Sequence, residues 1–116
     1  MTQQSESSLA RVATPLAAAL VMAAVVLFAP QALNDGDTWW HMATGEWILA
    51  HGRVPDRDVF SYSMAGHPWV AHEWLSEALM ALAARIAGWS GLVILFAAVA
   101  GGSAWLLARR LSRDLG

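Results

Sequence analysis

Two carboxylates separated by a single glycine are the most chemically suggestive feature of the sequence. Asp35 and Asp37 lie in the string Asn34-Asp35-Gly36-Asp37, directly after a long apolar stretch. Both can turn toward one divalent cation, and hard oxygen ligands of this kind suit Mg²⁺ or Mn²⁺ bridging to a phosphate. His41 follows Asp37 by one helical turn, so these two side chains can converge. The pattern predicts either a metal site or a helix N-cap, in which Asn or Asp accepts backbone N–H bonds.

A second group of polar residues lies further along the chain. His72 and Glu73 could serve as metal ligands, as phosphate contacts or as an acid–base pair, although solvated residues at the start of a helix are the simpler alternative. The zinc-protease pattern His-Glu-x-x-His is incomplete, because Ser76 stands where the second histidine is required. Arg53 could bind an anionic phosphate group, although pairing with the nearby Asp56 is the simpler alternative.

Two uncharged stretches can anchor these residues in a bilayer. Val12–Ala29 and Ile86–Ala108 contain no charged residue. At about 1.5 Å per residue they reach roughly 27 Å and 34 Å as helices, enough to cross the hydrocarbon core. A cleaved signal peptide is the alternative for the first stretch, but its apolar core is long and the residues after Pro30 form a poor cleavage site. We therefore expect two membrane anchors.

The composition agrees with a membrane protein. Of the 116 residues, 57% are hydrophobic and only 14% charged, about half the charged fraction of an ordinary soluble domain. The net charge of −2 gives no electrostatic support for a nucleic-acid partner. Cysteine is absent, which excludes disulfides, thiolate metal sites and cysteine nucleophiles.

The distribution of charge predicts an orientation. Seven acidic residues lie between Asn34 and Glu77, against only Arg53 and Arg57. Arg11 precedes the first apolar stretch, and Arg109, Arg110 and Arg113 follow the second. By the positive-inside rule, both termini are expected in the cytoplasm and the central segment outside.

We expect an all-α membrane protein in which two transmembrane helices flank an external segment with two interfacial helices. The first interfacial helix should end at Gly52, a natural C-cap, although Glu46 interrupts its apolar face. The segments expected, by residue number, are a disordered cytoplasmic N-terminus (1–11), transmembrane helix 1 (12–33), an external loop (34–85) with amphipathic helices at about 38–51 and 69–87, transmembrane helix 2 (86–108) and a cytoplasmic basic tail (109–116).

The central segment also resembles a known class of enzyme. The strings Asp35-Gly36-Asp37-Thr38-Trp39-Trp40-His41 and Trp69-Val70-Ala71-His72-Glu73-Trp74 are similar to the beginning of bacterial polytopic glycosyltransferases of the GT-C class. This class includes oligosaccharyltransferase catalytic subunits and protein mannosyltransferases. The resemblance covers roughly residues 12 to 110. It implies an external loop with two juxtamembrane helices between the first two spans.

The resemblance implies a function as well. A sugar would pass from a polyprenyl-phosphate donor to an acceptor on the outer side of a bacterial inner membrane. Asp35 or Asp37 would be the catalytic base or the ligand of Mg²⁺ or Mn²⁺. We assign His41, His72, Glu73 and Arg53 as candidate contacts for the substrate or its phosphate.

The chain departs from the class in one major respect. Such enzymes have about ten or more spans, and this sequence has two. We therefore expect a fragment that is inactive alone and that requires further transmembrane helices of the same system. The alternatives are a small non-enzymatic membrane subunit that binds a partner membrane protein and, less favoured, part of a transporter.

Overall fold

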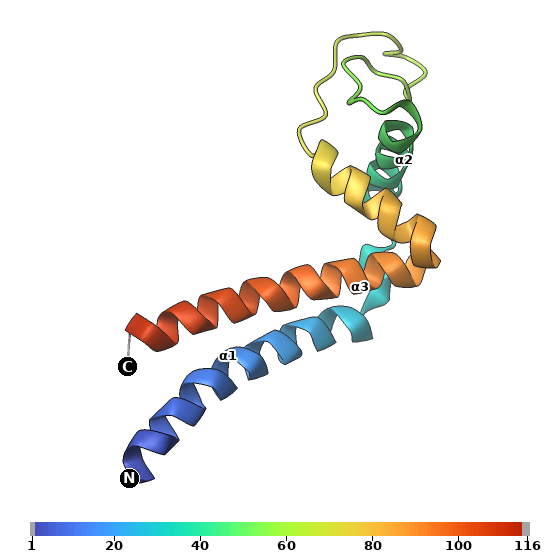
Figure 1. Cartoon of the computed structure of the whole chain (residues 1–116). Coiled ribbons are helices and arrows are strands. Elements are labelled where there is room, and N and C mark those ends of the chain that lie inside the picture. Colours follow the sequence, from blue (N-terminus) through green and yellow to red (C-terminus); the bar gives the residue numbers. More distant parts are fainter. Residues whose placement is uncertain (1, 115–116) are drawn as a thin grey trace. The chain divides into compact units, whose positions relative to one another are not determined.

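Helices account for the regular secondary structure of the computed structural model, which describes residues 2–114, with side chains from residue 8 onward (Figure 1). No β-strand occurs within these residues, so the all-α prediction is confirmed for them. The elements in chain order are α1 (Thr2–Phe28), the 3₁₀ helix η1 (Pro30–Leu33), α2 (Gly36–His51) and α3 (Trp74–Asp114).

The chain divides into two units. Unit 1 comprises Met1–Ala32 together with Val93–Gly116, and unit 2 comprises Leu33–Leu92. Unit 1 therefore holds α1 and the later part of α3. Unit 2 holds α2, the following loop and the beginning of α3, and it contains every candidate site residue named above.

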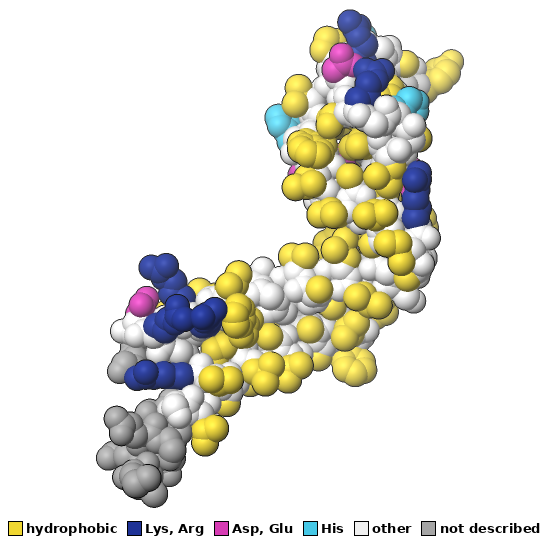
Figure 2. All heavy atoms as spheres, in the orientation of Figure 1, with side chains coloured by type: hydrophobic (Ala, Val, Ile, Leu, Met, Phe, Trp, Pro, Cys, Tyr) yellow, Lys and Arg dark blue, Asp and Glu magenta, His cyan; other side chains and the backbone are white. Residues whose placement is uncertain are grey.

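Within the part of the chain that the structure describes, two helices are long and apolar enough to cross a membrane. They are Ser8–Phe28, the part of α1 with described side chains, and α3, with mean hydropathies of 2.0 and 2.1. Only 6% and 22% of these apolar windows is buried within the chain. They are therefore not the packed core of a soluble domain formed by this chain alone. In unit 1, hydrophobic side chains cover the visible face over the helices, and basic side chains gather at one end (Figure 2).

Helix α1 is longer than expected at its beginning. Residues 1–11 were predicted to be disordered, but α1 begins at Thr2. Neither Pro nor Gly lies between Thr2 and Arg11, so nothing in the backbone interrupts the helix. Pro15 consequently lies inside α1. The helix ends at Phe28, because the residue before Pro30 is disfavoured in helical conformation. Residue 1 of the predicted N-terminus and residues 115–116 of the predicted basic tail lie outside the described residues.

Within unit 1, α1 and α3 approach each other at Gly101. A Cβ added there would lie 3.0 Å from the carbonyl oxygen of Ala19 and 3.3 Å from the Cβ of Ala23. A Cβ on the neighbouring Gly102 would meet nothing within 4 Å. Small residues on both helices thus permit close backbone packing, as they do between helices in membranes.

Helix α2 has a well-defined cap at each end. Asp35 precedes it in extended conformation, and its Oδ1 accepts a 2.7 Å hydrogen bond from the backbone N–H of Thr38. Gly52 follows it in the left-handed region, at φ 65° and ψ 21°, and its N–H donates to the Ile48 carbonyl at 2.8 Å. Glycine adopts that conformation without the steric penalty that other residues incur. The predicted C-cap at Gly52 is confirmed.

The loop between α2 and α3 is held by local hydrogen bonds. Residues 56–58 and 66–69 run antiparallel, with the N–H of Asp58 donating to His67 O at 2.9 Å and that of Trp69 donating to Asp56 O at 3.0 Å. The Asp58 carboxylate accepts from the backbone of Phe60 and from both the backbone and the hydroxyl of Ser61. These bonds lower the pKa of Asp58, with the Ser61 hydroxyl as the largest cause.

Helix α3 differs from the two separate helices expected at 69–87 and 86–108. It begins at Trp74, because Trp69 is still paired with the antiparallel loop, and it continues to Asp114. A kink interrupts it at Ala87 and Gly88, where Gly88 has φ 60° and ψ −146°. Only glycine adopts this conformation readily. The kink lies at the predicted junction between the second interfacial helix and the second span.

Candidate functional site

Helices α2 and α3 meet at a glycine in unit 2. A Cβ on Gly45 would overlap the backbone carbonyl of Glu77 and lie 2.9 Å from the Cβ of Ala81. Both Gly45 and Ala81 are fully buried or nearly so. Because Gly45 has no side chain, the two helices approach closely enough for polar side chains one turn away to touch.

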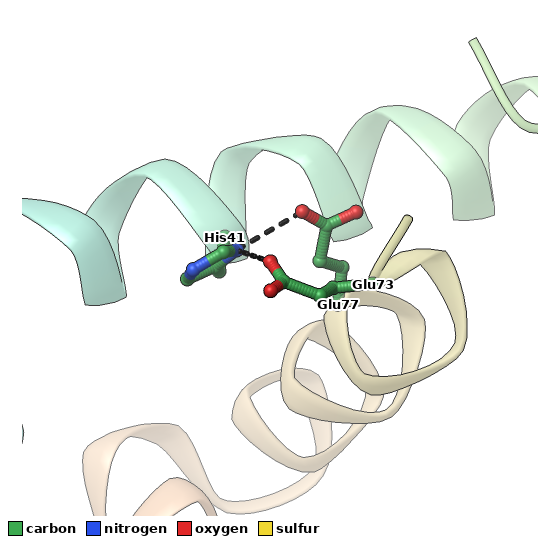
Figure 3. Close-up of side chains that lie close together, drawn as sticks. All are labelled: His41, Glu73 and Glu77. Atoms are coloured by element: carbon green, nitrogen blue, oxygen red, sulfur yellow. Dashed lines mark hydrogen bonds and ion pairs between the residues drawn. The ribbon is translucent and has the colours of Figure 1, made fainter. Parts of the chain in front are cut away.

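One such contact joins His41, one turn before Gly45, to Glu77 of α3 and to Glu73, which immediately precedes α3. His41 Nδ1 lies 3.0 Å from Oε1 of Glu77 and 3.6 Å from Oε2 of Glu73. Figure 3 shows both carboxylates turned toward the imidazole ring. Glu73 and Glu77 are four residues apart, so they occupy one face across the start of α3. The ligand atoms of the three residues all lie within 4.8 Å of one another.

The three side chains differ sharply in their exposure to solvent. The side chain of Glu73 is 65% exposed, that of His41 32%, and that of Glu77 only 3%. Oε2 of Glu77 has no hydrogen-bond partner among the described residues. An unpartnered oxygen on a buried carboxylate carries a desolvation cost, so its retention requires a compensating interaction.

This group was only partly anticipated from the sequence. His41 and Glu73 were predicted as substrate contacts, but Glu77 was not, and the two clusters were not expected to meet. The available signal was spacing: His41 precedes Gly45 by four residues, just as Glu73 precedes Glu77. Each interval is one helical turn, and a glycine inside a helix permits a second helix to approach closely.

The predicted Asp35 and Asp37 pair does not belong to this group. Asp35 is the N-cap of α2, which confirms the alternative considered for it, and Asp37 lies exposed in the first turn. The Thr38 N–H bond to Asp35 is the largest cause that lowers the pKa of this carboxyl below its usual value of 3.8. Asp35 is therefore ionised at neutral pH. A metal-binding or catalytic role for either aspartate remains a prediction.

The other two predicted contacts lie elsewhere in unit 2. His72 is exposed, immediately before Glu73. The Arg53 guanidinium lies over the Trp47 ring at 5.3 Å, and its NH1 is 3.9 Å from Asp56 Oδ1. The pairing with Asp56 considered from the sequence is therefore present, in addition to an aromatic contact. Such exposed pairs hold the side chain only weakly, so Arg53 is available for an anion.

A bidentate ion pair flanks the crossing of α2 and α3. Arg85 Nε donates to Oε1 of Glu46 at 3.1 Å, and its NH2 donates to Oε2 at 2.6 Å. Glu46, which interrupts the apolar face of the predicted helix, thus faces a cation on α3. This pair matches the geometry in which guanidinium and carboxylate bind best. Because Arg85 is committed to Glu46, it is not the cation that compensates Glu77.

Aromatic side chains pack the loop onto α2. The Trp40 ring centroid is 5.3 Å from that of Phe60 and 6.2 Å from that of Trp69, in tilted and edge-on arrangements. These are favourable geometries for aromatic pairs, each worth about 0.5–1.5 kcal/mol beyond the area buried. The loop is therefore packed against the helix that carries His41.

The site combines an imidazole with two carboxylates of unequal exposure. Such a set can transfer protons, with Glu77 orienting the His41 ring, or it can supply three ligand atoms to a cation. Comparison of the chain with models of protein families, with curated proteins and with solved structures gave no match.

Proposed function

We propose that this chain is the N-terminal part of a bacterial inner-membrane glycosyltransferase of the GT-C class, which uses a polyprenyl-phosphate-linked sugar. One observation carries the proposal: a folded segment rich in acidic, His and Trp residues lies in the chain between two apolar helices of membrane-spanning length. This order matches the resemblance seen in the sequence from Asp35 to His41 and from Trp69 to Trp74.

In the complete enzyme, Asp37 or Asp35 would accept the proton of the acceptor hydroxyl as that oxygen attacks the anomeric carbon and the lipid phosphate leaves. Oδ1 of Asp35 is engaged by Thr38 at 2.7 Å, whereas Asp37 is exposed in the first turn of α2, so Asp37 is the better placed base. Asp35 can still offer its second oxygen to Mg²⁺ or Mn²⁺. A bound divalent cation would neutralise the charge of the leaving phosphate.

Arg53 and His72 would contact the donor phosphate from the loop side. Both are exposed, and Arg53 is held only by a long ion pair and by the face of Trp47. Two apolar helices cannot enclose a lipid-linked donor, so activity would require further transmembrane helices. The same helices would cover the exposed apolar surface of α1 and α3.

The activity test uses membrane vesicles in which the chain is present with the remaining helices of its system. Transfer of a labelled sugar from a polyprenyl-phosphate donor is expected, and it should fall at least about 100-fold in the doubly substituted Asp35→Ala, Asp37→Ala variant. His67→Gln, a substitution in the exposed loop, serves as the control. Full activity in the double variant would refute the proposed mechanism.

The topology test uses the absence of native cysteine. A single Ser63→Cys substitution in the loop should react with a membrane-impermeant maleimide in intact spheroplasts, because the proposal places this loop outside and both termini in the cytoplasm. A cysteine at Ser112 should react only after permeabilisation. Labelling of Ser63→Cys only after permeabilisation would contradict the glycosyltransferase proposal.

A second function, favoured by a different observation, is that of a non-enzymatic membrane subunit. Leu75, Leu79, Leu82 and Ile86 recur at helical spacing on the beginning of α3, and their side chains are 45–76% exposed. Such a row can dock on a partner membrane protein. Cross-linking of this row to one specific partner, with no sugar transfer in the vesicle assay, would favour the subunit over the enzyme.

A further inference from the structure

We propose that His41, Glu73 and Glu77 form a binding site for a divalent transition-metal cation, best suited to Zn²⁺. This site is distinct from the Asp35 and Asp37 pair, and it can exist whether or not the chain belongs to a glycosyltransferase. The ligand atoms would be Nδ1 of His41 and one oxygen from each glutamate.

The spacing of these atoms suits a shared cation. Ligands about 2.1 Å from a metal ion are separated by about 3.0 Å at a right angle and about 3.4 Å at a tetrahedral angle. The distances from His41 Nδ1 are 3.0 Å to Glu77 and 3.6 Å to Glu73. The three ligand atoms lie within 4.8 Å of one another, and rotation of the exposed Glu73 side chain can bring its oxygen to the same ion.

The buried state of Glu77 provides an independent argument. Its side chain points at His41 and is 3% exposed, and Oε2 lacks a hydrogen-bond partner among the described residues (Figure 3). A buried carboxylate needs a cation or several donors close by. The nearest guanidinium on this helix, that of Arg85, is engaged by Glu46. A metal ion bound to Glu77 would supply the missing charge, and bidentate coordination would use Oε2 as well.

The ligand types indicate which ion is preferred. Imidazole nitrogen favours Zn²⁺ and related transition metals over Mg²⁺ and Ca²⁺, and carboxylates are compatible with Zn²⁺. Three protein ligands leave one position for water or substrate, as in catalytic zinc sites. The exposed Glu73 lies on the solvent side, which gives the ion an entry path and keeps the open position accessible to water.

The backbone fixes the register of the site. Gly45 lets α2 approach the Glu77 carbonyl, and the α2 side chain one turn earlier then faces the glutamates. His41 comes from α2, Glu77 from α3, and Glu73 from the residue immediately before α3. Ligands on packed helices are held more precisely than ligands on loops.

The test measures binding of Zn²⁺ alone to the full chain, purified in detergent with a tag that contains no histidine and stripped with a chelator. Titration calorimetry should give one Zn²⁺ per chain. Co²⁺ should give the absorption bands of a low-coordinate nitrogen and oxygen site. Mg²⁺ should not compete with Zn²⁺ even at about 100-fold excess.

Each ligand substitution has a distinct expected result. His41→Ala and Glu77→Gln should weaken Zn²⁺ binding by about 100-fold or more, and Glu73→Gln by about 10-fold. Because Glu73 is exposed, its substitution tests the site without disturbing the packing, and circular dichroism verifies the helix content of every variant. His67→Gln and Asp56→Asn, which change a histidine and a carboxylate outside the site, should bind as the unsubstituted chain does.

Three outcomes would overturn this proposal. The first is an absence of stoichiometric Zn²⁺ binding to the folded chain. The second is binding that Glu73→Gln and Glu77→Gln leave unchanged. The third is binding that is lost in the Asp35→Ala, Asp37→Ala variant instead, which would assign the cation to the aspartates. Since none of these readouts requires sugar transfer, failure here is distinguishable from failure of the proposed enzyme function.

Discussion

Gly45 of α2 lies directly against the backbone of Glu77 in α3, so closely that a Cβ at position 45 would overlap the Glu77 carbonyl oxygen. Gly45→Ala should therefore force the helices apart and destabilise unit 2 by about 1–3 kcal/mol, the usual cost of overpacking. Unfolding by denaturant in detergent, followed by Trp fluorescence, measures this loss. Gly36→Ala is the matched control, because a Cβ there meets nothing within 4 Å, and its stability should be nearly unchanged.

The contact between His41 and Glu77 should contribute to stability in the metal-free chain. His41→Ala removes the 3.0 Å partner of a carboxylate that is almost fully buried, and we expect a loss of about 1–3 kcal/mol. Glu73→Gln should cost less than about 1 kcal/mol, because its contact with His41 is longer and its side chain is exposed. A double-mutant cycle of His41→Ala with Glu77→Gln measures the coupling. Strictly additive effects would show that the two side chains do not interact.

The N-cap at Asp35 should make helix α2 sensitive to acid. The pKa of Asp35 is lowered in the folded chain, chiefly by the Thr38 N–H, so its ionised form is favoured by folding. The stabilisation is fully present above the ordinary pKa of 3.8 and is lost as the pH falls below 3.8 through the lowered folded value. Asp35→Asn keeps a capping oxygen without the charge. Its midpoint of unfolding should change less between pH 5 and pH 2 than that of the unsubstituted chain, and an identical pH profile would contradict this assignment.

The kink in α3 should depend on glycine at position 88. An alanine there must adopt φ 60° and ψ −146°, which costs about 1–3 kcal/mol, or else the helix must change its path. Gly88→Ala should therefore lower the thermal unfolding midpoint measured by circular dichroism. Gly102→Ala, in a regular part of the same helix with open space around the added methyl, should leave it unchanged or raise it slightly. Equal effects of the two substitutions would be evidence against strain at Gly88.

The contact between α1 and α3 in unit 1 can be tested by cross-linking, since the chain has no native cysteine. The Cβ of Ala23 lies 3.3 Å from the position of a Cβ on Gly101, close to the separation found in disulfides. The Ala23→Cys, Gly101→Cys variant should oxidise to an intramolecular disulfide, seen as a reducible shift in gel mobility. The Ala23→Cys, Gly102→Cys variant should not, because position 102 has no neighbour within 4 Å.

Several features could be predicted from the sequence because they depend on residues close together in the chain. The apolar runs determine where long helices form, because a long helix without charged side chains is stable in an apolar environment such as the bilayer. Asp35 and Gly52 limit α2 through bonds to backbone groups only three or four residues away. Pro30 ends α1 by a steric effect on its immediate neighbour.

The candidate site could not be predicted in the same way. His41 and Glu77 are 36 residues apart, and their contact depends on where one helix crosses another. That crossing is decided by the space left at Gly45, which allows the backbones to approach. Pairing of Glu46 with Arg85, 39 residues apart, follows from the same crossing. The spacing of residues along each helix determined the face on which these side chains lie. Only the packing of α2 on α3 decided which faces meet, because close packing depends on the shapes of both helix surfaces.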